Sequence, residues 1–228
     1  MACTRASPSS SDAATLGVRV NWRSSPAGQP GGAPARRQGV KHFDHNAHHH
    51  PFLLARVPEG ARTALDVGCG HGAFARELAA MGLAVTAVDR EVEAAVPGFR
   101  RADVLTDDLG GPYDFVSCIA VLHHLPLEEG LTRLRSLVAP GGVLAVLGLA
   151  REEGALDRAL SLVSVPLNLA HRLVRDDPPQ TAPVRGWSLS LREIREVADR
   201  VVPGARFRRH LYWRYSMVWA APGAGGRN

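Results

Sequence analysis

From Thr63 onward, short apolar runs alternate with stretches in which apolar residues recur at helical spacing. The first run, residues 63–67, is typical of a buried strand. Further strand-like runs follow at residues 83–88, 99–104, 113–120 and 143–149. Because helical stretches separate these runs, the pattern predicts a parallel sheet covered by helices on both faces.

The helical stretches have recognisable faces and ends. The helix predicted over residues 73–81 places Phe74, Leu78 and Met81 on one face, and Gly82 ends it. A short helix is predicted over residues 91–95. A third helix opens at Pro126, and its apolar positions are Leu127, Leu131, Leu134 and Val138. The sequence Pro140-Gly-Gly142 ends that helix.

The C-terminal part departs from this alternation. Ser190 and Glu193 have the spacing of a capping box, which predicts a helix that Pro203-Gly204 ends. Residues 206–219 then predict two strands whose connection is too short for a helix. Two strands joined in this way must be antiparallel. Right-handed crossovers between the earlier strands give a doubly wound α/β fold, whose ligand site lies beyond the carboxyl ends of the strands.

Charge is distributed unevenly along the 228 residues. Residues 1–62 hold eight basic and three acidic residues, whereas residues 63–228 hold 19 of each. The net charge of +5 therefore belongs to the N-terminal part, and a basic nucleic-acid-binding face on the folded part is disfavoured. Residues 1–39 are rich in Ser, Gly and Pro and have no apolar periodicity, which predicts a disordered basic leader. An organelle transit peptide and a nucleic-acid arm are the alternatives for this segment.

The composition also limits the setting of the protein. The longest apolar stretch spans about ten residues, 141–150, against the roughly 20 that a bilayer requires, so we expect no membrane span. The three cysteines, Cys3, Cys69 and Cys118, are scattered and odd in number, which favours a reducing, cytoplasmic compartment over a disulfide framework.

A glycine-rich loop, Asp66-Val-Gly-Cys-Gly-His-Gly72, follows the first predicted strand. Glycines let the backbone approach a ligand closely, and amides at the start of the next helix attract an anionic group. Asp89 lies 21 residues after Gly68, at the end of the second strand, where a carboxylate can accept both ribose hydroxyls of a nucleoside. This arrangement predicts a nucleoside-containing cofactor.

Two cofactors fit this geometry. Gly68-x-Gly70-x-x-Ala73 matches the dinucleotide fingerprint of nicotinamide-dependent oxidoreductases. Asp66 decides between the two, because a carboxylate pointing into the loop would repel a pyrophosphate and attract an ammonium or sulfonium group.

The chain resembles the class I S-adenosylmethionine-dependent methyltransferases through five motifs in order. They are residues 65–72 for the first motif, 85–89 for the ribose-binding strand, 102–104 for the adenine-binding turn, 114–125 for the fourth strand and its extension, and 137–144 for the turn into the fifth strand. The resemblance covers residues 40–221 or so and implies a Rossmann-like, seven-stranded, mostly parallel sheet with a reversed terminal strand. It also implies S-adenosylmethionine as cofactor.

The resemblance implies a role for each matching residue. The backbone of Gly68 and Gly70 would hold the methionine part, with Asp66 near its ammonium group, and Ile119 and Ala120 would line the methionine side. Asp89 would bind the ribose. At the adenine, Arg90 would cover the ring, Asp103 would accept its amino group and Val104 would pack against it. The stretch before Asp103 is short for the family, so Asp107 and Asp108 are alternatives to it. Loop capping is the alternative role for all of these carboxylates.

Two histidines, His123 and His124, follow the fourth predicted strand, where the transferable methyl group is expected. Either can orient a nucleophile or take its proton, and we place His124 ahead; the alternative is a structural turn. A second group, His42, His45, His48, His49 and His50, lacks the Cys or acidic partners of a metal site, so no metal is expected.

The predicted organisation is thus a leader (1–39) and a methyltransferase domain (40–228). The domain would include an N-terminal lid segment (40–62) and a substrate-cap insertion (151–187). We expect methyl transfer to a small molecule and no nucleic-acid substrate, because the fourth strand lacks an Asn-Pro-Pro-Tyr-type motif. A nicotinamide-dependent oxidoreductase and a non-catalytic cofactor-binding domain are the alternatives.

Overall fold

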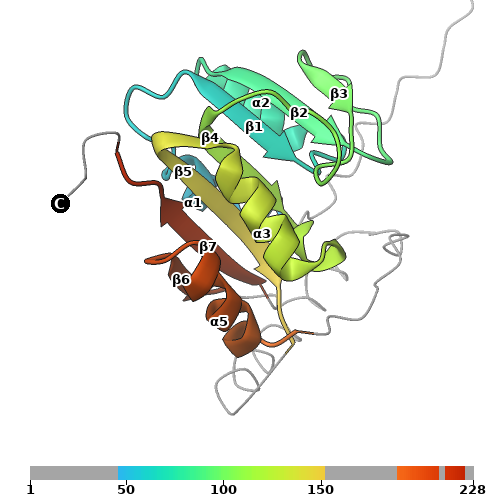
Figure 1. Ribbon diagram of the computed structural model, residues 1–228. Helices are drawn as coiled ribbons and strands as arrows, with labels where there is room; N and C mark the ends of the chain where they lie inside the picture. Colours follow the sequence, from blue (N-terminus) through green and yellow to red (C-terminus); the bar gives the residue numbers. More distant parts are fainter. Residues whose placement is uncertain (1–45, 152–188, 211–213, 224–228) are drawn as a thin grey trace, which may run out of the picture. The chain divides into compact units, whose positions relative to one another are not determined.

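The computed structural model describes residues 46–151, 189–210 and 214–223 (Figure 1). Within them, seven strands form one sheet in the order β3-β2-β1-β4-β5-β7-β6. The strands are β1 (Thr63–Val67), β2 (Ala84–Asp89), β3 (Phe99–Arg101), β4 (Tyr113–Ile119), β5 (Val138–Leu149), β6 (Arg206–Arg209) and β7 (Arg214–Ala220). The pairs from β3 through β5 are parallel, and β7 is antiparallel to both β5 and β6. The predicted fold class is confirmed, including the reversed strand.

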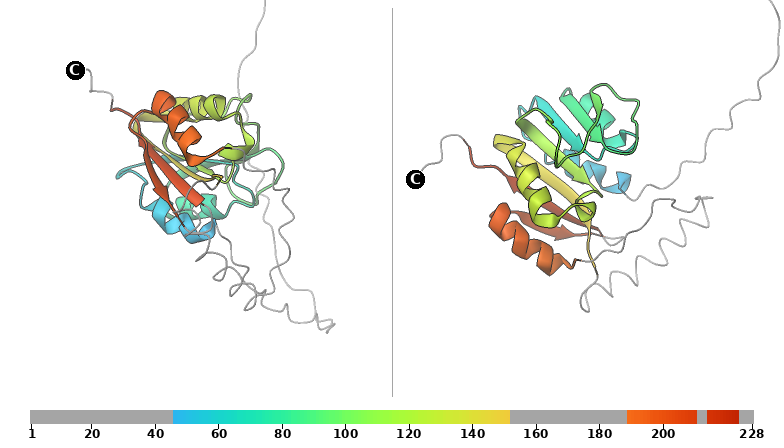
Figure 2. Two further views of the ribbon diagram at one scale, coloured as in Figure 1. Left: turned by 90° about the horizontal axis from the view of Figure 1, so that it is seen from below. Right: turned by 45° about the vertical axis from the view of Figure 1, so that its right-hand side comes forward.

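Helices cover both faces of this sheet. They are the 3-10 helices η1 (Ala47–His49) and η2 (Leu122–His124) and the α-helices α1 (His50–Leu54), α2 (Ala73–Ala80), α3 (Leu127–Ser136) and α5 (Leu191–Val201). One core cluster joins the strands to Leu131 of α3 and Ile194 of α5. The other joins them to Leu53 of α1 and to Phe74 of α2. Figure 2 shows α3 and α5 on one side of the sheet and α1 and α2 on the other.

The local sequence accounts for the helix ends. Ser190 accepts a hydrogen bond from the backbone N–H of Glu193, whose side chain accepts one from the N–H of Ser190. The predicted capping box is therefore present and fixes the start of α5. Pro126 precedes α3, and two glutamates lie in its first turn, where the helix dipole favours negative charge.

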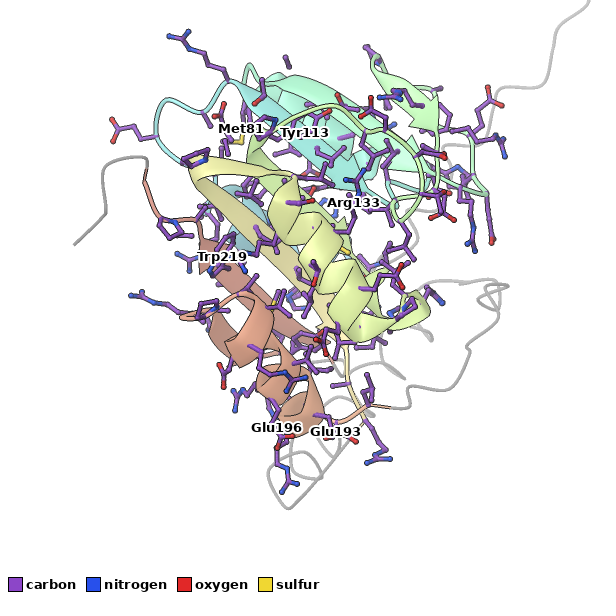
Figure 3. All side chains as sticks on the ribbon, in the orientation of Figure 1. Met81, Tyr113, Arg133, Glu193, Glu196 and Trp219 are labelled. Atoms are coloured by element: carbon purple, nitrogen blue, oxygen red, sulfur yellow. The ribbon has the colours of Figure 1, made fainter. Side chains whose placement is uncertain are left out.

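Four local predictions are wrong. Residues 91–95 form no helix, because Asp89 Oδ1 accepts hydrogen bonds from the backbone N–H of Glu91 and of Val92 and so fixes a turn instead. Met81, which is labelled in Figure 3, caps α2. It is 51% exposed, so it is not on the buried face. Val138 is buried but belongs to β5, where it pairs with Tyr113, so α3 ends at Ser136 and Pro140-Gly-Gly142 lies within β5 instead of ending the helix.

The fourth error concerns the third strand, which ends at Arg101 rather than at residue 104. The next three residues instead begin the turn that the resemblance assigns to adenine. The leader, His42 and His45 of the lid segment, and the substrate-cap insertion after Arg151 lie outside the described residues. In the part that the structure describes, no helix is long and apolar enough to cross a membrane.

The parallel strands all end at one edge of the sheet, where β7 begins. Arg214, the first residue of β7, pairs with Leu149, the last residue of β5. The end of β6, where Arg209 pairs with Tyr215, and the start of β7 therefore lie at the edge at which β1, β2, β4 and β5 end. This edge is where a doubly wound sheet binds its ligands.

Candidate cofactor and acceptor site

The glycine loop between β1 and α2 has the backbone that its sequence predicts. Gly68, Gly70 and Gly72 have φ angles of +66°, +52° and +76°, which residues with a Cβ rarely adopt. A Cβ on Gly68 would overlap Cγ2 of Val121, whereas one on Gly70 would meet no described atom within 4 Å. Gly68 is therefore needed for packing against the end of β4, and Gly70 leaves open space beside the loop.

Asp66 is buried directly beneath this loop, with 2% of its surface exposed. Its Oδ1 accepts a hydrogen bond of 2.7 Å from Ser117 Oγ on β4, and its Oδ2 has no hydrogen-bond partner among the described residues. Burial raises the pKa of the carboxyl from 3.8 to about 7, while the Ser117 hydroxyl and the nearby Ala75 amide oppose the shift and the charge of Asp89 adds to it. A buried carboxyl with one unpartnered oxygen is suited to an ammonium ligand.

Asp89 ends β2 and faces the same loop. Its Oδ2 accepts the backbone N–H of Gly70 at 3.0 Å, and its Oδ1 accepts the two amides of the following turn. Loop capping is thus one role of Asp89. A carboxylate oxygen has two lone pairs, so these bonds leave acceptor capacity for ribose hydroxyls at its half-exposed surface.

The structure brings Arg90 and Asp103 together beyond β2 and β3. Arg90 Nη1 donates to Asp103 Oδ2 at 3.3 Å, and Arg90 also pairs with Glu91. The other oxygen of Asp103 accepts the N–H of Leu105, while Val104 is a core residue. Arg90 and Asp103 therefore flank one place at the edge, as a shared adenine site requires.

The two alternatives to Asp103 lie in different places. Asp107 Oδ2 accepts the backbone N–H of Asp103 and so belongs to the same turn. Asp108 accepts the N–H of Gly110 and belongs to the next one. Of the two, Asp107 is the one that could share the site with Asp103.

Arg133 of α3 holds this turn in place, and the sequence analysis missed it. Its Nε donates to the carbonyl of Val104 at 3.0 Å, and its Nη2 donates to the carbonyl of Asp107 at 2.7 Å. Figure 3 labels Arg133 on α3. Its partners lie 29 and 26 residues away along the chain, so no local pattern indicates this contact.

The end of β4 closes the loop side of the site. Ile119 and Ala120 are half-buried, and the N–H of Ala120 donates to the carbonyl of Leu147 on β5. Ala120 has a φ of +56° and is the one non-glycine residue with positive φ in the described ranges. Such strain persists where the surroundings dictate the conformation and is frequent at functional sites. The strained turn directs the chain past Gly68 and into η2.

The two predicted catalytic histidines lie on η2 in different surroundings. His124 is exposed and His123 is half-buried, and their rings lie 4.0 Å apart. Nδ1 of His123 is buried and has no hydrogen-bond partner among the described residues. Burial lowers the pKa of His123 to about 4, and the charges of His124 and Arg214 add to this effect. His123 is therefore neutral at pH 7.

Further basic residues reach this end of β4 from distant parts of the chain. Arg214 Nε donates to Asn46 Oδ1 at 3.2 Å, which joins β7 to the segment before η1. His210, which follows β6, lies beside Ser216 Oγ at 2.8 Å from its Nε2, and its ring lies 4.8 Å from that of His49. The histidine group before β1 thus lies partly against the β6–β7 hairpin. Within the described ranges, no group of three or more potential ligands could hold a metal ion.

Comparison with known proteins decides what family these features represent. Residues 41–175 match the family model described as a methyltransferase domain. The chain belongs to this methyltransferase family. An uncharacterized methyltransferase of Mycobacterium tuberculosis is 36% identical over 197 residues, which covers 78% of this chain and 96% of that protein. The resemblance found in the sequence is confirmed, and with it the class I, S-adenosylmethionine-dependent type.

More distant relatives agree with this family. A ubiquinone biosynthesis O-methyltransferase of Caulobacter vibrioides is 29% identical over 161 residues, covering 64% of this methyltransferase and 59% of that protein. The crystal structure of magnesium protoporphyrin IX methyltransferase from Synechocystis with bound S-adenosylmethionine has a TM-score of 0.50 and 18% identity, and it covers 77% of each chain. The latter likeness supports the fold.

The residues of this methyltransferase fit S-adenosylmethionine on the structure's own terms. The unpartnered Oδ2 of Asp66 matches an ammonium group, and the open space at Gly70 admits a ligand beside the loop. The carboxylate of Asp66 beneath the loop would also be a poor neighbour for a pyrophosphate. The site therefore favours a cationic amino-acid sulfonium over a dinucleotide.

Proposed function

We propose that this methyltransferase transfers a methyl group from S-adenosylmethionine to a small organic molecule held beyond the end of β4. The observation that supports this most directly is the buried Asp66 beneath the glycine loop, with its unpartnered Oδ2. We further propose a cytoplasmic enzyme that does not act on nucleic acids. Cys69 and Cys118 are both free thiols, which is consistent with a reducing compartment.

The proposed cofactor contacts follow the order of the strands. Asp66 binds the ammonium group, Asp89 accepts the ribose hydroxyls, and Asp103 with Arg90 holds the adenine. Ile119 and Ala120 line the methionine side. These residues end four neighbouring strands, so a single extended ligand along the sheet edge can reach all of them.

The cofactor supplies a methyl group on a sulfonium, which is a good leaving group. The chain's own contribution is mainly to align the acceptor with that methyl group, since an in-line displacement gains most from positioning. Where the acceptor is a hydroxyl, its proton must leave as the new bond to carbon forms and the carbon–sulfur bond breaks. We propose that His124, the exposed member of the pair, takes that proton, with the neutral ring of His123 beside it at 4.0 Å.

Cofactor binding by the full-length protein tests the proposal first. S-adenosylmethionine and S-adenosylhomocysteine should raise the melting temperature, and NAD should not. Stabilisation by NAD alone would indicate an oxidoreductase.

Turnover is the second test. Release of S-adenosylhomocysteine with a panel of small phenols, amines and carboxylic acids should identify at least one acceptor. Tight binding of S-adenosylmethionine without turnover on any acceptor would favour the non-catalytic alternative.

A further inference from the structure

The sheet edge that holds the site is divided by charge. Three carboxylates lie at this part of the edge, those of Asp66 on β1, of Asp89 at the end of β2 and of Asp103 in the turn after β3. Two exposed arginines of that half form ion pairs, since Arg90 bonds to Asp103 and Arg101 lies 3.9 Å from Glu93. This half of the edge suits a cationic ligand.

The other half is lined by imidazole and guanidinium groups. We call it the basic rim and define it by His123, Arg208, His210 and Arg214. Each comes from β6, β7 or the chain that directly follows β4 or β6. His48 and His49 of η1 lie against it, because the ring of His49 is 4.8 Å from His210 and the charge of His48 acts on His210.

Burial and neighbouring positive charges lower the pKa of both imidazoles in the basic rim. After burial, the influences that lower the pKa of His123 are the charges of His124 and Arg214. For His210 they are burial first and then the charges of Arg208 and His48. Both imidazoles are therefore neutral at pH 7, and the positive charge of the rim is that of Arg208 and Arg214, which attracts an anion.

The rim also offers donors in a suitable place. Arg214 begins β7 beside the last residue of β5, so its guanidinium lies at the exit of the strands and is oriented through Nε by Asn46. The guanidinium of Arg208 lies over the ring of Phe52, 5.6 Å from its centroid. Arginines held at one position by other side chains are suited to binding carboxylates, because they lose little freedom when the anion arrives.

On the basis of the proposed function, we propose that the methyl acceptor carries a carboxylate, which binds at the basic rim between Arg214 and His210. The cationic cofactor and the anionic acceptor then lie on the two halves of one edge, with the end of β4 between them. The carboxylate is either the methylated group or the anchor of an acid that is methylated at a hydroxyl.

The two possibilities differ in their proton balance. When the carboxylate itself is methylated, an oxygen–carbon bond forms and the carbon–sulfur bond breaks, so that the negative oxygen and positive sulfur both become neutral. No proton moves, and no base is needed. When a hydroxyl of the acid is methylated, the same bonds change and one proton passes to His124 or to water.

Matched pairs of acids and amides test this proposal in the full-length protein. Benzoate, 4-hydroxybenzoate, 4-hydroxycinnamate and octanoate would each be compared with the primary amide of the same acid. Thermal shift in the presence of S-adenosylhomocysteine reports binding, and release of S-adenosylhomocysteine from S-adenosylmethionine reports turnover. We expect acids to give the larger shift and at least tenfold higher kcat/KM than amides. Alkaline hydrolysis of the product distinguishes a methyl ester from a methyl ether.

Variants identify the rim as the source of that preference. Arg214→Gln should raise KM for the preferred acid about 10- to 100-fold with a small change in kcat, and Arg214→Lys should recover part of the loss. Arg208→Gln, at an exposed position, should reduce the preference if Arg214→Gln fails to fold. Arg192→Gln is the matched control, because Arg192 is exposed on α5 and paired with Glu196.

The outcomes distinguish a failure of the acidic-acceptor proposal from a failure of the proposed methyl transfer. Equal shifts and equal turnover for acids and amides, with cofactor binding intact, would overturn the acidic acceptor and leave methyl transfer standing. Unchanged KM in both Arg214→Gln and Arg208→Gln would also overturn it. Loss of cofactor binding itself, in the wild type, would instead refute the proposed function.

Discussion

The strongest prediction concerns Asp66, because the ionisation of its buried carboxyl affects both the stability of the protein and its affinity for the cofactor. The change from 3.8 to about 7 corresponds to about 4 kcal/mol, since each tenfold change in proton affinity is worth 1.36 kcal/mol. An acid with a raised pKa in the folded state binds its proton more tightly there than in the unfolded chain. Its stabilising effect is therefore complete below pH 3.8 and is lost as the pH rises to about 7.

The substitution Asp66→Asn removes this titration and keeps the size of the side chain. Between pH 5 and pH 8, the free energy of unfolding of the cofactor-free wild type should fall by on the order of 2–3 kcal/mol relative to the variant. The amide of the variant also lacks a hydrogen-bond partner, and this lowers the free energy of unfolding by the same amount at both pH values. The test therefore compares how the free energy of unfolding changes with pH and not its absolute value. Urea denaturation at several pH values measures it.

Cofactor binding should show the complementary trend. An ammonium group beside Asp66 favours the ionised carboxyl, so wild-type affinity for S-adenosylmethionine should rise with pH until about pH 7 and then level off. Asp66→Asn should bind at least tenfold more weakly at pH 8 and lack this rise. Isothermal titration calorimetry measures both effects.

Asp114 provides a control of opposite sign. Its Oδ2 accepts bonds from the amides of Arg62 and Thr63, which lower the pKa of its carboxyl. Stability from Asp114 is therefore lost as the pH falls, and Asp114→Asn should remove that acid-side loss. Parallel pH profiles for the wild type and Asp66→Asn would refute the reasoning about burial.

Three further predictions concern the rest of the site. Asp89→Ala should weaken cofactor binding at least tenfold by calorimetry, because hydrogen bonds to a charged acceptor are worth about 1.5–3 kcal/mol each, and an unchanged Kd would contradict the ribose assignment. Gly68→Ala should lower the free energy of unfolding by at least about 2 kcal/mol in urea, through its positive φ and its overlap with Val121, and adding Val121→Ala should recover part of the loss. On a hydroxyl acceptor, His124→Ala should lower turnover by roughly 10²–10⁴-fold while the affinity for the cofactor is retained. If this variant and His123→Ala both keep full activity, positioning alone accounts for the rate.

The sequence predicted features whose causes are local. β1 has the predicted bounds because five consecutive residues, buried or nearly so, leave no helical periodicity. The glycine loop has the expected φ angles because only glycine adopts them readily. The capping box of α5 is present because Ser190 and Glu193 form both of its bonds within four residues.

Features that depend on side-chain hydrogen bonds or on distant contacts were missed. The helix expected over residues 91–95 is replaced by a turn, because the carboxylate of Asp89 competes for its first amides. Three side chains of the site bond to partners at least 26 residues away along the chain. They are Ser117, Arg133 and Arg214, and nothing in their own segments marks them out. Only the order of strands in the sheet brings them together.

Arginine at the outer strands has a consequence for solubility. An open sheet leaves the backbone of its two outermost strands available for pairing with another chain, which is a common start of aggregation. Here those strands are β3 and β6, with the sequences Phe-Arg-Arg and Arg-Phe-Arg-Arg. A second copy pairing at either border would set guanidinium groups opposite one another, and the repulsion would disfavour fibril-like stacking. We therefore expect the five arginines of these two strands to disfavour self-association.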